Sequence, residues 1–290
     1  MSISRAGDRT VSYIFLKGEA SGGTTATDAT YKYHTFTASG TFTVTVSGSF
    51  EVLVIGGGGA GAYGGGGAGA LIYKSLKLAR GDYSVVVGAG GTADGAGAIT
   101  NGENSKFGDL VRAIGGGHGA YYVRSLVGAS ATREQLSSEG GCGGGGSAYY
   151  NGTGINSYAV CRYGETGLVG YDGGSWNGSS QTQKTASGGG GGMGAAGANG
   201  ATVTPGAGGI GTSDYSAWGS ATSTGEEDTG TYYYCGGGGA IATGAYSVGG
   251  LGGGATGANP PSGGLANTGG GGAGYHGTGG SGLVIIRYEL

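Results

Sequence analysis

One stretch of the sequence decides the fold. In it, a short apolar run passes directly into glycine: Val52-Leu53-Val54-Ile55-Gly56-Gly57-Gly58-Gly59-Ala60-Gly61-Ala62-Tyr63-Gly64-Gly65-Gly66-Gly67-Ala68-Gly69-Ala70. Further glycine-rich runs recur at residues 115–119, 140–146, 188–197, 206–211, 236–239, 249–254 and 269–274. Because glycine has no Cβ, such runs either stay unstructured or pack backbone against backbone unusually closely. The choice between these two states decides the fold.

Composition favours an ordered protein. The chain has 80 Gly among 290 residues, far above the usual share of about 7%. Collagen is excluded, because there is no Gly-X-Y register and only 3 Pro. Disordered chains are highly charged and poor in aromatics, whereas this chain is 37% hydrophobic and 11% charged, with 20 Tyr and 2 Trp. Ordering glycine costs roughly 0.5–1 kcal/mol per residue relative to alanine, so hydrogen bonding, packing or assembly into an oligomer must offset that cost.

Consecutive glycines favour a bundle of extended rods. A chain without side chains can adopt the extended helix with three residues per turn, which rises about 3.1 Å per residue and has no internal hydrogen bonds. Rods of this polyglycine-II type that lie side by side, parallel or antiparallel, can satisfy each other's backbone groups. The Ala, Tyr and Ile residues among the glycines should face outward or fill gaps. The alternative is a set of flexible linkers, which would not need this recurrence.

The remaining segments predict β-strands and almost no helix. Residues 31–37 and 41–46 alternate apolar and polar residues around Ala38-Ser39-Gly40, which predicts a hairpin. The apolar run at residues 51–55 is suited to a strand buried on both faces. Other expected strands are residues 11–16, 70–78, 83–87, 108–114 and 283–289. The nearest approach to an amphipathic helix is residues 125–138. We therefore expect an all-β fold in which β-sandwich-like strands flank the rod bundle.

Three regions follow from this pattern. Residues 1–30 form a lead-in that is either an attachment segment or an ordinary edge strand. Residues 31–114 form a β-strand domain with the first glycine runs. Residues 115–290 form the rod bundle with long loops, closed by a carboxy-terminal strand at residues 283–289 that we expect to pair with the early strands.

Tyrosine and tryptophan cluster in the loops between the glycine runs. Such side chains give large contact area at low entropic cost, and the surrounding Ser, Gly and Asn supply adaptable hydrogen bonds, as in known recognition surfaces. The alternative is that these aromatics fold back and cover the rods, and we expect both roles. The candidate receptor-binding residues are Tyr121, Tyr122, Tyr149, Tyr150, Tyr158, Tyr163, Tyr171, Trp176, Tyr215, Trp218, Tyr232, Tyr233, Tyr234 and Tyr246.

Nothing in the sequence supports catalysis or a cofactor. The segment Gly56-x-Gly58-x-x-Gly61 formally matches a dinucleotide fingerprint, but that motif needs a helix at its third glycine, and a further glycine run follows instead. His34, His118 and His276 lack metal-ligand spacing. The acidic triplet Glu226-Glu227-Asp228 is better explained as a solvated loop than as a cation site. We predict neither an enzyme nor a metal protein.

Charge and hydropathy exclude two classes of partner. The net charge of −3 gives no footprint for nucleic acid. No apolar stretch approaches the roughly 20 residues of a membrane helix, and the amino terminus lacks a signal-peptide layout. Cys142, Cys161 and Cys235 are odd in number, so they are either buried free thiols or one bridge plus a free thiol.

The order of segments resembles the glycine-rich domain of bacteriophage tail-fibre proteins and related bacterial surface proteins. The resemblance covers about residue 31 to the end. It also extends to the tip adhesins of T-even-like phages, in which polyglycine rods display variable receptor-binding loops. The segments that carry it are Thr41-Phe42-Thr43-Val44, the opening stretch from Val52 to Gly61, Tyr83-Ser84-Val85-Val86-Val87-Gly88-Ala89-Gly90-Gly91 and Gly279-Gly280-Ser281-Gly282-Leu283-Val284-Ile285-Ile286-Arg287-Tyr288.

The resemblance implies a virion protein that acts outside the cell and recognises a host glycan or outer-membrane protein. Its other partners would be tail-fibre or virion proteins, and it could assemble as a homo-oligomer such as a trimer. One alternative is a self-assembling surface fibre or a virion decoration protein. Another is an ice-binding protein, although bulky aromatic loops would spoil the flat face that such a protein needs.

Overall fold

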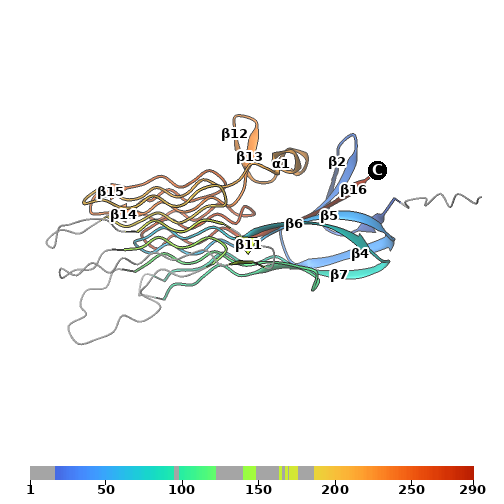
Figure 1. Cartoon of the computed structure of the whole chain (residues 1–290), viewed down its shortest axis with the longest axis horizontal. Helices are drawn as coiled ribbons and strands as arrows, with labels where there is room; N and C mark the ends of the chain where they lie inside the picture. Colours follow the sequence, from blue (N-terminus) through green and yellow to red (C-terminus); the bar gives the residue numbers. More distant parts are fainter. Residues whose placement is uncertain are drawn as a thin grey trace, which may run out of the picture.

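The computed structural model describes residues 17–94, 98–121, 140–147, 163–164, 167–168, 170–175 and 186–290. At one end lies a sandwich of two five-stranded antiparallel sheets (Figure 1). The first sheet has the order β1 (Glu19–Ser21), β4 (Gly40–Val46), β7 (Gly81–Val86), β8 (Ser105–Phe107), β9 (Val111–Ala113). The second has the order β2 (Thr24–Thr27), β3 (Tyr31–Phe36), β16 (Leu283–Glu289), β5 (Gly48–Ile55), β6 (Leu71–Leu78).

Aromatic rings fill the space between the two sheets. Because side chains alternate along a strand, every second residue of β4 and β7 points inward, and Phe42 and Val44 are fully buried. The Phe42 ring meets the Phe50 ring edge to face at 5.7 Å and the Phe107 ring at 5.9 Å. Such aromatic pairs stabilise a core beyond the area that they bury. The sandwich therefore has a core of its own, separate from the glycine region.

The predicted hairpin between residues 31–37 and 41–46 is wrong. Both segments are strands, β3 and β4, but they belong to different sheets: β3 pairs with β2 and β16, whereas β4 pairs with β1 and β7. The linking residues make a corner between the sheets, and Phe36 and Phe42 meet across the sandwich with ring centroids 6.4 Å apart. The Phe36 and Phe42 rings can be buried against each other across the sandwich only if β3 and β4 belong to different sheets.

The carboxy-terminal strand pairs among the early strands, as predicted. β16 lies between β3 and β5 and is antiparallel to both. Its first four residues, Leu283–Ile286, are fully buried, as are Val52 to Ile55 of β5. The apolar runs of these two strands are explained by burial on both faces: one face packs inside the sandwich, and the other faces the segment at residues 212–234.

The lead-in is part of the sandwich where the structure describes it. β1 and β2 fall within residues 1–30 and pair with β4 and β3. The expected strand at residues 11–16 and the helix-like pattern at residues 125–138 lie outside the described residues. Within the described ranges the only helix is α1 (Ser216–Thr222), which the sequence did not indicate. No helix in these ranges is long and apolar enough to cross a membrane.

The glycine runs form a bundle of extended rods that continues the sandwich (Figure 1). The rod at residues 56–61 donates its backbone N–H groups to three different neighbours in strict rotation. The bonds run from Gly56 and Gly59 to the rod at 64–70, from Gly57 and Ala60 to the rod at 98–104, and from Gly58 and Gly61 to the rod at 277–282, with donor–acceptor distances of 2.8–3.2 Å. A period of three is what a rod with three residues per turn requires.

The carbonyl groups of the same rod accept from three further rods. Gly57 and Ala60 accept from the rod at 115–120, Gly58 accepts from Gly91, and Gly59 accepts from Gly272. One rod thus lies among six others, each bonded through the backbone. The rotation recurs at residues 188–192, which bond in turn to the rods at 140–147, 194–200 and 235–241. These runs are therefore ordered rods and not flexible linkers. Their detailed polyglycine-II conformation stays a prediction, which the period of three supports.

Only glycine fits this spacing. A Cβ built on Gly58 would lie 2.0 Å from the carbonyl oxygen of Gly270, and one on Gly90 would lie 1.9 Å from that of Gly279. The alanines among the glycines fill gaps, since Ala60, Ala62 and Ala68 are fully buried.

The rods have two distinct ends. Rods leave β5, β7 and β9 at the sandwich and turn back at the far end, which we call the distal end. This end carries the hairpin of β14 (Ile241–Ala242) and β15 (Ala245–Tyr246) (Figure 1). A further two-stranded pair, β10 (Tyr163–Gly164) and β11 (Gly167–Leu168), is described only in its backbone.

Residues 212–234, which we call the lateral projection, leave the side of the bundle near the sandwich (Figure 1). They contain α1 and the hairpin of β12 (Glu226–Asp228) and β13 (Thr231–Tyr233). Two hydrogen bonds between Thr212 and Tyr234 close its base.

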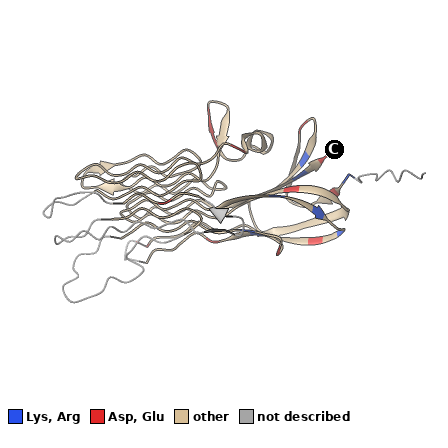
Figure 2. Cartoon of the chain, viewed as in Figure 1, with Lys and Arg blue, Asp and Glu red and all other residues tan. Residues whose placement is uncertain are grey.

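Charge is distributed unevenly between the two ends. Among the described residues, every Lys and Arg lies at the sandwich end: Lys17, Lys32, Lys74, Lys77, Arg80, Lys106, Arg112 and Arg287 (Figure 2). The described rods carry few charged groups of either sign, and the described residues of the distal turns carry no cation.

Candidate functional site

Two turns between rods and the end of a further rod bring aromatic side chains to the distal end. Tyr63 lies at the turn between the rods at 56–62 and 64–70, Tyr121 ends the rod that leaves β9, and Tyr275 and His276 form the turn between the rods at 269–274 and 277–282. Backbone bonds join these turns. The N–H groups of Tyr275 and His276 both donate to the Ala62 carbonyl, and those of Tyr63 and Gly64 donate to the Ala120 carbonyl.

Their rings form one contact group, which we call the distal aromatic cluster: Tyr63, Tyr121, Tyr275 and His276. The Tyr63 and Tyr121 rings meet edge to face at 5.7 Å, and His276 lies 5.6 Å from both Tyr121 and Tyr275. Tyr275 is 38% exposed and the other three side chains are half-buried. The cluster is held by rigid rods and still reaches the surface.

The turn that carries two of these rings has an unfavourable backbone. Tyr275 has a φ of 70° and His276 a φ of 73°. Positive φ is uncommon outside glycine, and held in this way it costs on the order of 1–3 kcal/mol per residue. Such residues persist only where the surrounding structure holds them, and they occur preferentially at functional sites.

The imidazole of His276 is neutral near pH 7. Burial lowers its pKa below the ordinary value, and nearby Asp94 opposes this shift only in part. The Nδ1 atom is buried and has no hydrogen-bond partner. A buried polar atom without a partner is rare in a folded protein and needs an explanation, such as a bound water or ligand.

The predicted receptor-binding residues separate into surface and buried positions. Tyr171 and Tyr246 are exposed, at 45% and 48%, and Tyr246 ends the β14–β15 hairpin at the distal end. Trp218 is 4% exposed and Tyr234 is fully buried. Burial removes these last two from any surface that contacts a receptor, because their rings cover the sandwich and the rods instead.

Tyr234 has a structural role at the base of the lateral projection. Its hydroxyl contacts the Thr224 side chain at 2.8 Å, and burial raises its pKa to about 12. Tyr232 and Tyr233 are half-buried in β13, with the Tyr232 N–H donating to the Ser216 hydroxyl at 2.9 Å. The tyrosine run at residues 232–234 is thus mainly packing.

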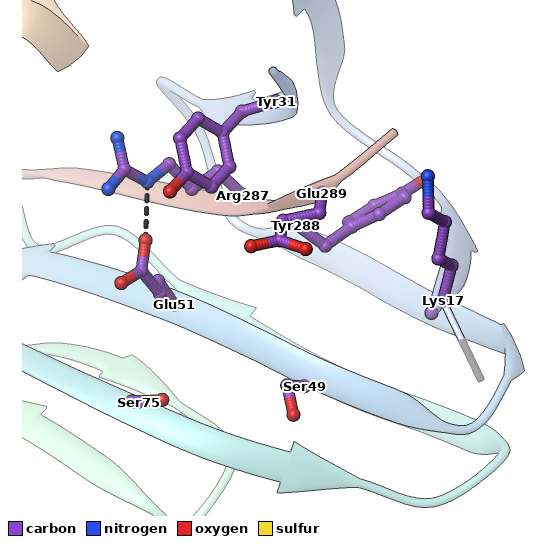
Figure 3. A pocket seen from close by; sticks show the side chains of 9 residues that line it. Lys17, Tyr31, Ser49, Glu51, Ser75, Arg287, Tyr288 and Glu289 are labelled. Atoms are coloured by element: carbon purple, nitrogen blue, oxygen red, sulfur yellow. Dashed lines mark hydrogen bonds and ion pairs between the residues drawn. The ribbon is translucent and has the colours of Figure 1, made fainter. Parts of the chain in front are cut away.

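Tyr215 and Trp218 belong to a second group of rings on the outer face of the second sheet, which we call the junction cluster. The Arg287 guanidinium lies between the rings of Tyr31, at 3.9 Å, and Trp218, at 4.4 Å. Its Nε donates to Glu51 Oε2 at 2.5 Å (Figure 3). Tyr215 lies 5.7 Å from Tyr73 and 6.1 Å from Trp218. This group fastens the lateral projection to the sheet.

A pocket of about 360 Å³ opens beside the junction cluster (Figure 3). Lys17, Arg287, Glu51 and Glu289 line it together with Ser49 and Ser75. The two cationic and two anionic side chains of this lining balance in charge. One carboxylate oxygen of Glu51 bonds to Arg287, and the other accepts from the Tyr73 hydroxyl at 2.5 Å. That hydrogen bond, aided by burial, raises the pKa of Tyr73 to about 12. The pocket offers no selective charge to a ligand.

The described residues contain no cluster of His, Cys, Asp and Glu side chains that could hold a metal ion. Within the acidic triplet, Glu226 Oε2 accepts the N–H groups of Gly252 and Gly253, both at 2.7 Å, and so ties the β12–β13 hairpin to the bundle. Cys142 and Cys235 are buried and form no disulfide, which agrees with the alternative of buried thiols. Cys161 lies outside the described residues.

Five predicted site residues also lie outside the described residues: Tyr122, Tyr149, Tyr150, Tyr158 and Trp176. Tyr163 is placed only as part of β10. Conversely, three members of the distal aromatic cluster, Tyr63, Tyr275 and His276, were not among the predicted site residues. The signal that could have identified them is their position, because each interrupts a glycine run where a rod turns.

Comparison with known proteins agrees with this architecture. The model of a family described as a glycine-rich domain matches residues 36–289. The chain belongs to this family. The match covers the rods and the sandwich strands from β4 onward. A search of curated proteins found no match.

Proposed function

We propose that this glycine-rich domain is a non-enzymatic receptor-binding protein of a bacteriophage tail fibre. In the virion it would recognise a glycan or an outer-membrane protein on the host surface. The observation that carries the proposal is the distal aromatic cluster, in which two rod turns and one rod end hold Tyr63, Tyr121, Tyr275 and His276 at the end remote from the sandwich.

A rigid scaffold suits this role. Rods bonded to their neighbours through the backbone lose little further freedom when a receptor binds, and preorganisation of this kind increases affinity. Tyrosine and tryptophan are enriched among the residues that contribute most to binding interfaces. Tyr122, Tyr149, Tyr150, Tyr158 and Trp176 lie outside the described residues and stay candidate receptor contacts. Tyr171 and Tyr246 stay candidates as exposed rings.

The opposite end of the molecule suits attachment. Lys17 and Leu290 lie together at the sandwich end, where the Lys17 amino group donates to the Leu290 carbonyl. Other tail-fibre or virion proteins would bind here, and a homotrimer would join its copies here. This arrangement would leave the distal end free to meet the host.

The proposal is tested by binding of the purified, fluorescently labelled protein to a panel of bacterial strains. We expect saturable binding to a subset of strains and competition with phage adsorption on them. A variant with alanine at Tyr121, Tyr171, Tyr246 and Tyr275 should lose this binding and keep the circular dichroism spectrum of the parent. Arg112→Lys, an exposed change at the sandwich end, is the control and should bind normally.

Two outcomes would contradict the proposal. Binding that survives in the four-residue variant, and also survives replacement of residues 122–139, 148–169 and 176–185 by short linkers, excludes these aromatic residues as receptor contacts. Electron microscopy that shows filaments of the purified protein, with no strain-dependent binding, would favour the alternative of a self-assembling surface fibre.

A further inference from the structure

The distal aromatic cluster carries a more specific inference, which rests on the proposed function and concerns the class of receptor. Its backbone is fixed by the rods. The Ala62 carbonyl accepts from both Tyr275 and His276, and the Ala120 carbonyl accepts from Tyr63 and Gly64. The backbone positions of these four residues, on two turns and one rod end, are therefore set by the lattice before any ligand arrives.

The strained turn indicates that these side chains are not present for stability. Tyr275 and His276 are flanked by Gly274 and Gly277, and glycine at either position would relieve the positive φ at no steric cost. The chain is rich in glycine, yet this turn has two large rings with φ values of 70° and 73°. Glycine would remove this strain, so the presence of tyrosine and histidine here points to a ligand contact.

The polar character of the cluster points to an uncharged partner. The His276 ring is neutral, and its buried Nδ1 has no partner. A hydroxyl group can donate to this atom or accept from it, whichever tautomer is present, directly or through one bridging water. The described residues of the distal turns contribute no Lys or Arg that would favour a phosphate or a carboxylate (Figure 2).

We propose that the distal aromatic cluster binds a neutral pyranose residue of a cell-surface polysaccharide. The exposed Tyr275 ring would cover the apolar face of the sugar, with Tyr121 beside it. His276 Nδ1 would take up one sugar hydroxyl. An anionic sugar would gain nothing from this neutral site and would lose solvation on binding.

The test uses the full-length protein and saturation-transfer difference NMR with defined probes. The neutral probes are the methyl pyranosides of glucose, galactose, mannose, rhamnose and N-acetylglucosamine. The anionic probes are glucose 6-phosphate and galacturonate with its carboxylate unesterified and ionised. We expect at least one neutral pyranoside to bind in preference to the anionic probes, and Tyr121→Ala to weaken that binding about tenfold.

Tyr275→Gly is the decisive variant, because it removes the ring and the strain together. We expect it to weaken sugar binding about tenfold or more while its Tm rises, as expected for a residue kept for binding. Val248→Ala is the control: it shortens an exposed apolar side chain of the rod bundle that belongs neither to the cluster nor to the candidate receptor contacts. It should leave sugar binding unchanged.

The outcomes separate this inference from the proposed function. If no neutral pyranoside binds, or if binding is equal in Tyr275→Gly and the parent, the sugar site is refuted, even where the protein binds cells. If a sugar binds through Tyr275 but the protein binds no bacterial strain, the sugar site stands and the receptor-binding function fails. Preference for the anionic probes would also overturn the inference.

Discussion

At the scale of one residue, Gly58 shows why the rods exclude side chains. A Cβ at this position would lie 2.0 Å from the carbonyl oxygen of Gly270 and 2.5 Å from its carbon. That carbonyl cannot give way easily, because it accepts from Gly280 at 2.8 Å within the lattice. We expect Gly58→Ala to lower the free energy of unfolding by about 3 kcal/mol, at the upper end of the usual cost of overpacking. Denaturant unfolding measures the change.

Gly40→Ala is the matched control for this prediction. A Cβ on Gly40 would make ordinary contact with the Phe36 ring at 3.5 Å. Alanine also reduces the freedom of the unfolded chain, so the change should be within about 1 kcal/mol of the parent. Equal losses for the two variants would show that the lattice tolerates a methyl group, which is incompatible with the packing described here.

His34 should make the sandwich sensitive to acid. It is fully buried, with Nδ1 2.7 Å from the Gly22 carbonyl and its ring stacked on Tyr288 at 5.6 Å. Burial lowers its pKa, the hydrogen bond to Gly22 opposes that shift, and Lys32 adds to it. The unfolded chain therefore binds a proton at higher pH than the folded one. The stabilisation that His34 contributes is fully present above its unfolded pKa of about 6.5. It is lost as the pH falls through that value toward the folded pKa.

The measurement is the Tm as a function of pH. We expect the Tm of the parent to fall between about pH 7 and pH 5, and His34→Gln to reduce that fall, because its amide can donate to Gly22 without titrating. His276 has a pKa shifted in the same direction by burial, so His276→Gln serves as a comparison for the contribution of the distal turn. An unchanged Tm profile in His34→Gln would exclude His34 as the cause.

At the scale of an element, one guanidinium contributes to fastening the lateral projection to the second sheet. Arg287 lies 3.9 Å from the Tyr31 ring centroid and 4.4 Å from that of Trp218 while bonded to Glu51. Lysine retains the charge but not the planar stacking. We expect Arg287→Lys to cost about 2 kcal/mol, the value for a partly desolvated cation–π contact, and to loosen residues 212–234 before the rods.

Hydrogen exchange read peptide by peptide measures this loosening. Amides of α1 and β13 should exchange faster in Arg287→Lys, whereas those of the rod at 56–61 should not change. Arg112→Lys is the control, because Arg112 is exposed on β9 and takes part in no described ring contact. Uniformly faster exchange across the whole chain would instead assign Arg287 to global stability.

The strands show what a sequence can and cannot reveal about this fold. β5 and β16 could be predicted because burial on both faces leaves a continuous apolar run, such as Val52 to Ile55. The pairing partners of β3 could not be predicted in this way. Alternation identifies a strand and its inner face, but the corner at residues 38–39 is decided by Phe36 and Phe42 meeting across the sandwich. That contact follows from the assembled sheets and has no local signature.

Only part of the candidate site could be predicted from the sequence. Tyrosine-rich segments indicate a surface, but composition does not separate the exposed Tyr246 from the fully buried Tyr234. The distal aromatic cluster joins Tyr63 and His276, which are more than two hundred residues apart in the chain. Their meeting requires the order in which rods turn and stack, and the glycine runs themselves carry no side chain that specifies this order.

At the scale of the whole molecule, the last strand closes both the sandwich and the bundle. β16 lies between β3 and β5, and the rod at 277–282 that leads into it bonds to the rod at 56–61. Ending the chain at Gly282 removes the central strand of the second sheet and exposes two strand edges. Because unpaired edges promote aggregation, we expect this truncation to abolish cooperative unfolding and to give soluble aggregates.

Calorimetry and size-exclusion chromatography measure the two effects together. Deletion of Leu290 alone is the control: it removes the hydrogen bond to the Thr30 carbonyl at 2.9 Å but leaves every ladder bond of β16. That variant should unfold cooperatively, with a Tm close to the parent. If the protein ending at Gly282 still melts in one sharp transition, the rods fold independently of the sheet. The molecule would then consist of two separable units, a lattice of rods and a sandwich, with β16 a part of the sandwich alone.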